Sequence, residues 1–161
     1  MAEIIRAHDD DWSLVREIRL RSLSTDPAAF GQSWEKESTY EDKVWRKRVR
    51  EAAWFLGVED KQPVAVVAAR REEDSPDNER ELQAMWVTPG SRKEGIALLL
   101  AEAVFEWAKE DGADTVTLYV GPDNTGARAV YDSLGFEDTG DRWVVVEDDP
   151  DGAWLKMSRS V

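Results

Sequence analysis

The chain has 161 residues, of which 42% are hydrophobic and 34% charged, a composition typical of a globular protein that forms a single domain over residues 1–161. It has no cysteine, which excludes disulfides, thiolate metal sites and cysteine nucleophiles. The net charge of −13 disfavours nucleic acid and anionic membranes as partners. Because we also find no secretory signal and no bilayer-length apolar run, we expect a cytoplasmic protein without membrane contact.

The N-terminal third predicts one strand and two helices. Residues 3–6 have the pattern of a short edge strand. Residues 9–23 predict a helix, because aspartates at its start suit the helix dipole and apolar side chains recur at helical spacing. Residues 24–33 contain a proline and a glycine that break this helix, and residues 40–52 predict a second one.

The middle of the chain predicts a hairpin followed by a strand–helix–strand unit. The hairpin joins residues 53–59 to residues 63–70. After a polar loop, residues 82–87 predict a strand, a helix runs to about Glu110, and residues 114–120 predict a second strand. Such a unit makes its two strands parallel, with a right-handed crossover. Since the hairpins are antiparallel, we expect an α+β fold with a mixed, mostly antiparallel sheet flanked by helices.

The C-terminal part predicts a helix over residues 124–134 and a final strand pair over residues 142–147 and 153–158. The acidic connection Glu147–Gly152 resembles a calcium loop only superficially, because a glutamate takes its first ligand position and Ser158 the place of the bidentate glutamate. A turn is expected there, and we expect no metal. His8 is the only histidine, so no local serine–histidine–aspartate triad is predicted.

The central helix opens on a glycine, which costs about 1 kcal/mol relative to alanine. Its first turn leaves backbone N–H groups unpaired, and these favour an anion together with the helix dipole. Gly95 and Ala97 leave room for a phosphate, and Arg92 and Lys93 add positive charge. The alternative is a plain loop-to-helix junction whose glycine eases packing against the sheet.

Two familiar phosphate motifs do not fit this segment. Gly90 and Gly95 have P-loop spacing, but Ile96 and Ala97 stand where lysine and serine or threonine are required. No G-x-G-x-x-G follows any predicted strand, so a dinucleotide-binding fold is not indicated.

Two segments, VTPGSRKEGIALLL from Val87 and LYVGPDNTGARAVYDSLGF from Leu118, resemble the GCN5-related N-acetyltransferase (GNAT) superfamily. Arg92–Ala97 matches the Arg/Gln-x-x-Gly-x-Gly/Ala signature that follows a strand. The second half of the signature matches at Asn124, Ala127, Tyr131 and Gly135-Phe136. The two halves stand in the expected order and on the expected elements.

The resemblance implies a sheet splayed between its two central parallel strands, with acetyl-coenzyme A wedged into the gap. Backbone groups of the first parallel strand would bind the pantetheine and the acetyl carbonyl, the turn before the central helix would bind the pyrophosphate, and an asparagine would bind the pantetheine arm. The cofactor contacts implied in this way are Met85, Trp86, Val87, Arg92, Lys93, Glu94, Gly95, Ile96, Ala97 and Asn124. Glu94 departs from the usual small or basic residue at its position.

By the same resemblance, Tyr131 would donate a proton to the leaving thiolate, and its alternative role is packing beneath Gly135-Phe136. Some members carry a glutamate base in the second parallel strand, where Tyr119 stands here. Glu81, at the start of the first parallel strand, is the substitute base, unless it is an ordinary exposed glutamate at the end of the polar loop.

The acceptor is expected to be a primary amine of a small molecule or a protein. The candidate acceptor contacts are Phe30, Trp34, Tyr119 and Trp143. With Tyr40, Glu35, Glu37, Glu41 and Asp42 nearby in the sequence, they suit a cationic amine, or they form core and solvated surface. The alternative function is a non-catalytic CoA-binding module that retains the cofactor slot. The resemblance also admits a homodimer.

Overall fold

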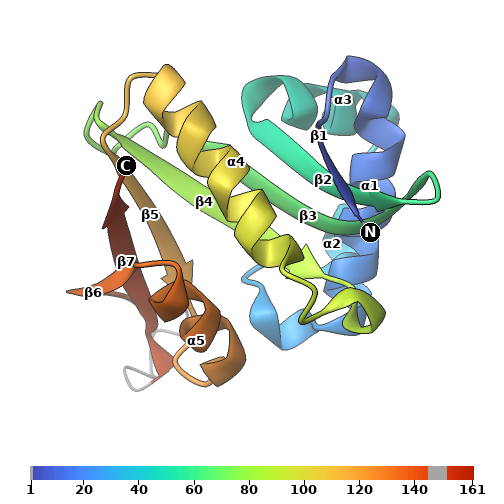
Figure 1. The fold of residues 1–161 in the computed structure, drawn as a ribbon. Helices are drawn as coiled ribbons and strands as arrows, with labels where there is room; N and C mark the ends of the chain where they lie inside the picture. Colours follow the sequence, from blue (N-terminus) through green and yellow to red (C-terminus); the bar gives the residue numbers. More distant parts are fainter. Residues whose placement is uncertain (1, 145–151) are drawn as a thin grey trace.

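A computed structural model of the protein describes residues 2–144 and 152–161 (Figure 1). Its helices and strands follow in the order β1 (Glu3–Arg6), α1 (Trp12–Thr25), α2 (Trp34–Glu37), α3 (Asp42–Glu51), β2 (Ala53–Glu59), β3 (Gln62–Arg70), β4 (Glu79–Val87), α4 (Ile96–Glu110), β5 (Thr115–Val120), α5 (Thr125–Ser133), β6 (Glu137–Trp143) and β7 (Trp154–Ser160). Single 3-10 turns lie at Asp9–Asp11, Pro27–Ala29 and Pro89–Ser91. This confirms the expected mixed fold.

The described strands form one seven-stranded sheet in the order β1-β2-β3-β4-β5-β7-β6. Every neighbouring pair is antiparallel except β4 and β5, which are parallel as expected. Their ladder holds only Glu79, Arg80 and Glu81 opposite Thr115, Val116 and Thr117. Beyond Glu81 the two strands diverge, and the sheet divides into two wings (Figure 1).

The central strands are buried on both faces, which explains why their sequences read as almost continuous apolar runs. In β3, Ala65, Val67 and Ala69 pack toward α4. Val66 and Ala68 pack toward α1 and α3 on the other face. Figure 1 shows α4 crossing one face of the sheet while α1 and α3 cover the opposite one. Two apolar cores therefore flank the sheet.

A β-bulge interrupts β4 just after its parallel pairing ends. Gln83 lies opposite Ala68 and Trp86 opposite Val66, so two residues of β4 face the single Val67. Ala84 has a positive φ of 59° there. The bulge changes the alternation of side chains, and Leu82 and Met85, three residues apart, therefore contact the same α4-side core.

Most element boundaries agree with the sequence predictions within a few residues, and the exceptions have physical causes. The four-residue helix α2 was not predicted, because one turn carries no periodicity. β4 begins at Glu79 rather than Leu82, inside the predicted polar loop. β6 covers Glu137–Trp143 and so begins before the predicted residues 142–147, of which 145–147 lie outside the described residues. It is an exposed edge strand whose polar residues hide its pattern. The predicted turn at residues 147–152 lies largely outside the described residues.

Candidate active site

A cleft of about 910 Å³ opens where β4 and β5 part. It is lined by residues of the loops and helices before β2, by β4, by β5 and α5, and by the last hairpin. Glu81 forms the last pair of the parallel ladder, opposite Thr117, and also lines the cleft, so it lies where the strands separate. Seven of the side chains predicted for the site line it: Phe30, Glu81, Met85, Tyr119, Asn124, Tyr131 and Trp143.

The two faces of β4 contribute different chemistry to this cleft. Met85 and Tyr131 belong to the α4-side core. Leu82 also faces α4, so its neighbours Glu81 and Gln83 point to the face covered by α1 and α3. The residues predicted to bind the cofactor therefore lie mainly on one face, and the predicted base lies on the other.

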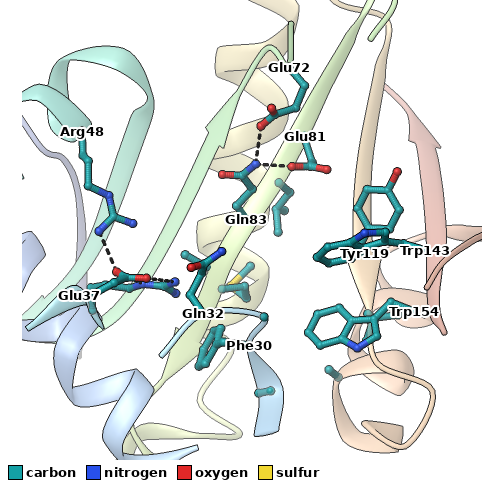
Figure 2. Close-up of a pocket in the computed structure, with 18 of the residues that line it drawn as sticks. Phe30, Gln32, Glu37, Arg48, Glu72, Glu81, Gln83, Tyr119, Trp143 and Trp154 are labelled. Carbon is teal, nitrogen blue, oxygen red and sulfur yellow. Dashed lines mark hydrogen bonds and ion pairs between the residues drawn. The ribbon is translucent and has the colours of Figure 1, made fainter. Parts of the chain in front are cut away.

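Three aromatic rings form one wall of the cleft (Figure 2). The centroids of Tyr119 and Trp143 are 5.8 Å apart, and those of Trp143 and Trp154 are 5.9 Å apart, both edge to face. Trp143 and Trp154 are directly opposed in the β6–β7 ladder. This wall offers an apolar surface to whatever enters between the strands.

Glu81 is held by an amide that bridges two carboxylates. The Gln83 side-chain Nε2 donates to Glu72 Oε1 at 2.7 Å and also to Glu81 Oε2 (Figure 2). Burial raises the pKa of Glu81 above its ordinary value, and the charge of Glu72 adds to this, although the Gln83 hydrogen bond opposes it. A carboxyl group with a raised pKa is a better proton acceptor from an ammonium group than an exposed glutamate is.

A second carboxylate lies on the opposite side of the cleft, between two arginines. Glu37 is 1% exposed, and its oxygens accept from Arg19 Nε and NH2 at 3.0 Å each and from Arg48 NH1 at 2.8 Å (Figure 2). Burial alone would raise the pKa of Glu37, but the hydrogen bonds and charges of the two arginines lower it below the ordinary value. Glu37 is therefore an ionised structural partner of the arginines.

Tyr131 lies in α5, only 8% exposed, with its ring edge to face on Phe136 at 5.8 Å. Burial raises the pKa of its phenol well above the ordinary value, so the hydroxyl stays protonated at neutral pH. The ring packs on Phe136, which is the alternative role considered from the sequence, and the residue also lines the cleft. Its role as a proton donor stays a prediction.

The turn before α4 has the geometry of an anion cradle. Gly95 is the N-cap residue with φ +81°, a left-handed conformation that glycine adopts without strain. No side chain caps the helix, and the first bond of α4 runs from the Leu99 N–H to the Gly95 carbonyl at 3.2 Å. The N–H groups of residues 96–98 precede that bond and have no intrahelical partner. A Cβ at Gly95 would meet no atom within 4 Å.

These features fit the pyrophosphate of acetyl-CoA. Only main-chain groups of residue 96 could contact a phosphate, because the Ile96 side chain is 3% exposed and packs in the core. Lys93 also has a positive φ, of 67°, while Glu94 lies beside it and is exposed. The glycine is required by backbone conformation, and the space around it leaves the amides accessible.

The Arg92 side chain forms two hydrogen bonds that the sequence did not predict. Its NH2 donates to Asp26 Oδ2 at 2.7 Å and its Nε to the Val87 carbonyl at 2.9 Å. The same Asp26 oxygen accepts from the Trp86 indole at 2.7 Å. Arg92 therefore ties the phosphate turn to the end of α1 and to β4, and part of its charge is neutralised by Asp26.

The remaining predicted contacts are placed as follows. The Asn124 side-chain oxygen accepts from the Ala127 N–H at 3.2 Å as the N-cap of α5, which leaves its amide N–H groups for a ligand. The Trp86 side chain is buried in the α1-side core, so only its main chain could serve the cofactor. Trp34 is 45% exposed and does not line the cleft.

The structure also brings residues to the site that sequence reasoning did not select: Arg19, Gln32, Arg48, Gln83 and Trp154. One signal was available for Arg19, which interrupts the apolar stripe of α1 and so indicates a buried charge with a partner. Gln83 and Arg48 gave no such signal, because their partners come from separate elements.

Comparison with known proteins identifies the family of the chain. Residues 12–136 match the Acetyltransferase (GNAT) family, and the chain belongs to that family. It is 34% identical to N-acetyltransferase 8 of Mus musculus over 98 residues, 60% of this chain and 43% of that protein. It is 31% identical to the uncharacterized N-acetyltransferase MJ1207 of Methanocaldococcus jannaschii over 120 residues, 73% of this chain and 49% of that protein. These matches therefore span less than half the length of either relative.

Solved structures share the whole fold at low sequence identity. An acetyltransferase of the GNAT family from Streptococcus pneumoniae superposes with a TM-score of 0.82 at 15% identity, covering 100% of this chain and 99% of that one. The Salmonella typhimurium protein yncA, solved with its cofactor acetyl-CoA, gives 0.78 at 16% identity over 99% and 94% of the two chains. None of the described helices has the length and apolarity to cross a membrane. The described residues also contain no group of three His, Asp or Glu side chains that could hold a metal.

Proposed function

We propose that the protein is an acetyl-CoA-dependent N-acetyltransferase that acts on a primary amine. The observation that carries this proposal is that Glu81 and Tyr131 line one cleft at the point where the parallel strands part. One is a carboxyl group with a raised pKa and the other a phenol that stays protonated. Acetyl transfer to an amine needs one proton acceptor and one proton donor, and the cleft offers both.

The chemistry follows from these two groups. Acetyl-CoA, when bound, supplies the acetyl carbon as a thioester. An alkylammonium with a pKa of about 10 costs about 4 kcal/mol to deprotonate at pH 7, so a base is needed before the nitrogen can attack. In the proposal, Glu81 takes this proton. The N–C bond forms, the C–S bond breaks, and Tyr131 gives its hydroxyl proton to the departing sulfur. The second proton of the attacking nitrogen then restores the Tyr131 hydroxyl, and Glu81 releases the first proton to solvent.

The positions of the donors support these roles. The amides at the start of α4 and the N–H groups of Asn124 can hold the phosphates and pantetheine on the α4 side. Glu81 points to the other face, so the acceptor amine would approach from the α1 and α3 side. The two substrates would then meet at the gap between β4 and β5.

The test is Tyr131→Phe, assayed by thiol release with acetyl-CoA and a panel of amines. We expect kcat to fall by roughly 10²-fold, the usual contribution of a positioned acid, while the calorimetric Kd for acetyl-CoA stays unchanged. An unchanged kcat would contradict the role of Tyr131. Tight acetyl-CoA binding with no turnover of any amine would instead favour a non-catalytic CoA-binding module.

A further inference from the structure

The proposed base, Glu81, belongs to a charged cluster on the face of the sheet opposite α4. Arg70 stands directly opposite Glu81 in the β3–β4 ladder, so the two side chains share this face. Lys156 projects from it as well, because its neighbours Leu155 and Met157 pack in the α4-side core. The cluster contains two cations and three carboxylates: Arg70, Lys156, Glu72, Glu79 and Glu81.

Both cations of this cluster already have a carboxylate. Arg70 Nε lies 3.4 Å from Glu72 Oε1, and Lys156 Nζ lies 3.9 Å from Glu79 Oε2. Within the described part of the chain, no ion pair involves Glu81, and Lys156 acts on it only as the weakest of several influences. Glu81 is therefore the carboxylate of the cluster that lacks a paired cation.

The other titratable groups of the cleft lie on its remaining walls. The side formed by α1, α2 and α3 carries six charged side chains, Arg19, Lys36, Glu37, Lys47, Arg48 and Glu51. Three phenols also line the cleft, those of Tyr40, Tyr119 and Tyr131. Among the described residues, none of these groups forms a hydrogen bond or ion pair with Glu81. The side chains that act on Glu81 are instead Gln83, Glu72 and, more weakly, Lys156.

Gln83 joins this unpaired carboxylate to Glu72. Its Nε2 carries two N–H groups, and it donates to Glu72 Oε1 at 2.7 Å and to Glu81 Oε2 (Figure 2). Two like charges are thus held around one nitrogen atom. The bridge occupies Oε2 of Glu81, whereas Oε1 has no donor among the described residues and is not fully buried. Oε1 is therefore the oxygen that can accept a proton from a ligand in the cleft.

We propose that Gln83 and Glu72 are positioning residues for the base: Gln83 fixes Glu81 so that Oε1 faces the cleft, and the charge of Glu72 keeps that carboxylate a strong proton acceptor. This inference deepens the proposed N-acetyltransferase function and rests on it. The two residues act in opposite directions. The Gln83 hydrogen bond favours ionised Glu81 and lowers its pKa, while the neighbouring charge of Glu72 favours the protonated form and raises the pKa.

Two variants separate the charge of Glu72 from the bridge made by Gln83. Glu72→Gln removes the charge but keeps an oxygen that can accept from Gln83, and it also frees Arg70 to act on Glu81. Gln83→Met removes the bridge and keeps the charge. We expect the acid limb of the pH profile of kcat/KM to move down by about 0.5–1 unit in Glu72→Gln and up by a similar amount in Gln83→Met. All proteins are assayed with the same amine, so the ionisation of the acceptor cancels.

The plateau of the same profile reports the aim of the carboxyl group. A base that is no longer held in place should lower kcat in Gln83→Met by about 10-fold or more, since small misplacements of a catalytic group are costly. Glu73→Gln is the matched control, because it removes an exposed carboxylate next to Glu72 that does not line the cleft. Its profile should not move. Lower activity in both test variants with an unchanged acid limb would show a structural role only and overturn the proposal.

NMR separates failure of this inference from failure of the proposed function. The carboxyl carbon signal of Glu81, assigned by its loss in Glu81→Gln, gives the titration midpoint of this group without any turnover. If no amine is acetylated, the proposed function fails. Midpoints that move down in Glu72→Gln and up in Gln83→Met would still support the action of both residues on Glu81. A midpoint that stays unchanged in both variants would overturn the inference, even in an active enzyme.

Discussion

At the scale of single residues, the structure separates two glutamates that the sequence treats alike. Glu37 is ionised between Arg19 and Arg48, and its folded-state pKa is lowered. Glu81 is half-buried beside Glu72, and its pKa is raised. The first carboxylate stabilises the fold at neutral pH, and that contribution is lost as the pH falls through its folded-state pKa. The second costs stability when ionised, which is typical of a group retained for its chemistry.

Glu81→Gln should therefore raise stability and lower activity together. Because the folded state disfavours ionised Glu81, the wild-type protein loses stability as the pH rises above the ordinary glutamate pKa. We expect the variant to have a higher Tm than the wild-type protein at pH 7. The difference should vanish in acid, where Glu81 of the wild-type protein is protonated in both the folded and the unfolded state. Loss of a general base should reduce kcat by roughly 10²-fold or more.

The measurements are thermal unfolding from acid to neutral pH and kcat by thiol release. Glu73→Gln is the control, since Glu73 is exposed in the loop before β4 and does not line the cleft. A Glu81→Gln protein with full kcat would remove Glu81 from the mechanism, whatever its Tm.

The sequence can select candidate site residues where their spacing along the chain follows a motif. Gly95, Asn124 and Tyr131 lie at fixed intervals within one strand–helix–strand–helix segment, so a motif can locate them. Arg19, Glu37 and Arg48 meet beside the cleft only because α1, α2 and α3 fold together, and no local spacing encodes that contact.

At the scale of elements, the phosphate turn is fixed by an element far away in the sequence. Asp26, at the C-terminal end of α1, accepts both from the Trp86 indole in β4 and from Arg92 in the turn. The Trp86 hydrogen bond is the main cause that lowers the pKa of Asp26, with Arg92 contributing as well. The loop that follows Asp26 carries Phe30, which lines the cleft, so this carboxylate connects the turn before α4 to one wall of the cleft.

Asp26→Asn should destabilise the protein and weaken cofactor binding. Asp26 is about one-third exposed, so we expect a loss of about 1 kcal/mol and a fall in Tm of about 2–4 °C at pH 7. Because the folded-state pKa of Asp26 is lowered, its contribution exists above the ordinary aspartate pKa and disappears in acid. KM for acetyl-CoA should rise several-fold, with kcat nearly unchanged.

Unfolding curves and steady-state kinetics check this prediction. Asp74→Asn is the matched control, because Asp74 is exposed in the loop before β4 and does not line the cleft. A fall in kcat with an unchanged KM would show that Asp26 acts on the chemistry rather than on the turn.

Elements with clear periodicity were predictable, and those shaped by tertiary contacts were not. α4 is apolar around much of its circumference, and its burial follows from that pattern. The sequence did not predict the bulge at Ala84, since alanine is not a residue that favours a positive φ. Yet this bulge places Met85 on the α4 face of the sheet while Gln83 points to the opposite face. The different side chains on the two faces of β4 in the cleft therefore depend on the bulge.

At the scale of the whole molecule, the sheet separates two apolar cores, one on each of its faces. The sequence predicted the parallel strand pair, but the depth of the split depends on how far β4 and β5 remain paired. The ladder ends at Glu81, so the proposed base lies where the two strands separate. Beyond it β4 no longer pairs with β5, and Gln83, Ala84 and Met85 line the cleft there.

The net charge of −13 opposes the approach of an anionic cofactor, and the turn that would bind it has little local charge to compensate. Arg92 is paired with Asp26, and Lys93 is followed by Glu94. Raising the ionic strength from 0.01 to 0.15 M shortens the Debye length from about 30 to about 8 Å. We therefore expect the association rate of acetyl-CoA to rise by roughly 3–10-fold over this range.

Stopped-flow binding measures this rate directly, and S-acetylpantetheine provides the control, because it carries the same thioester without the phosphates. Its association should be nearly independent of salt, since long-range repulsion needs charge on both partners. If acetyl-CoA instead bound more slowly as salt increased, attraction by Lys93 and the amides of α4 would outweigh the repulsion of the whole molecule. The sign of the salt dependence therefore decides whether the local or the global field governs cofactor capture.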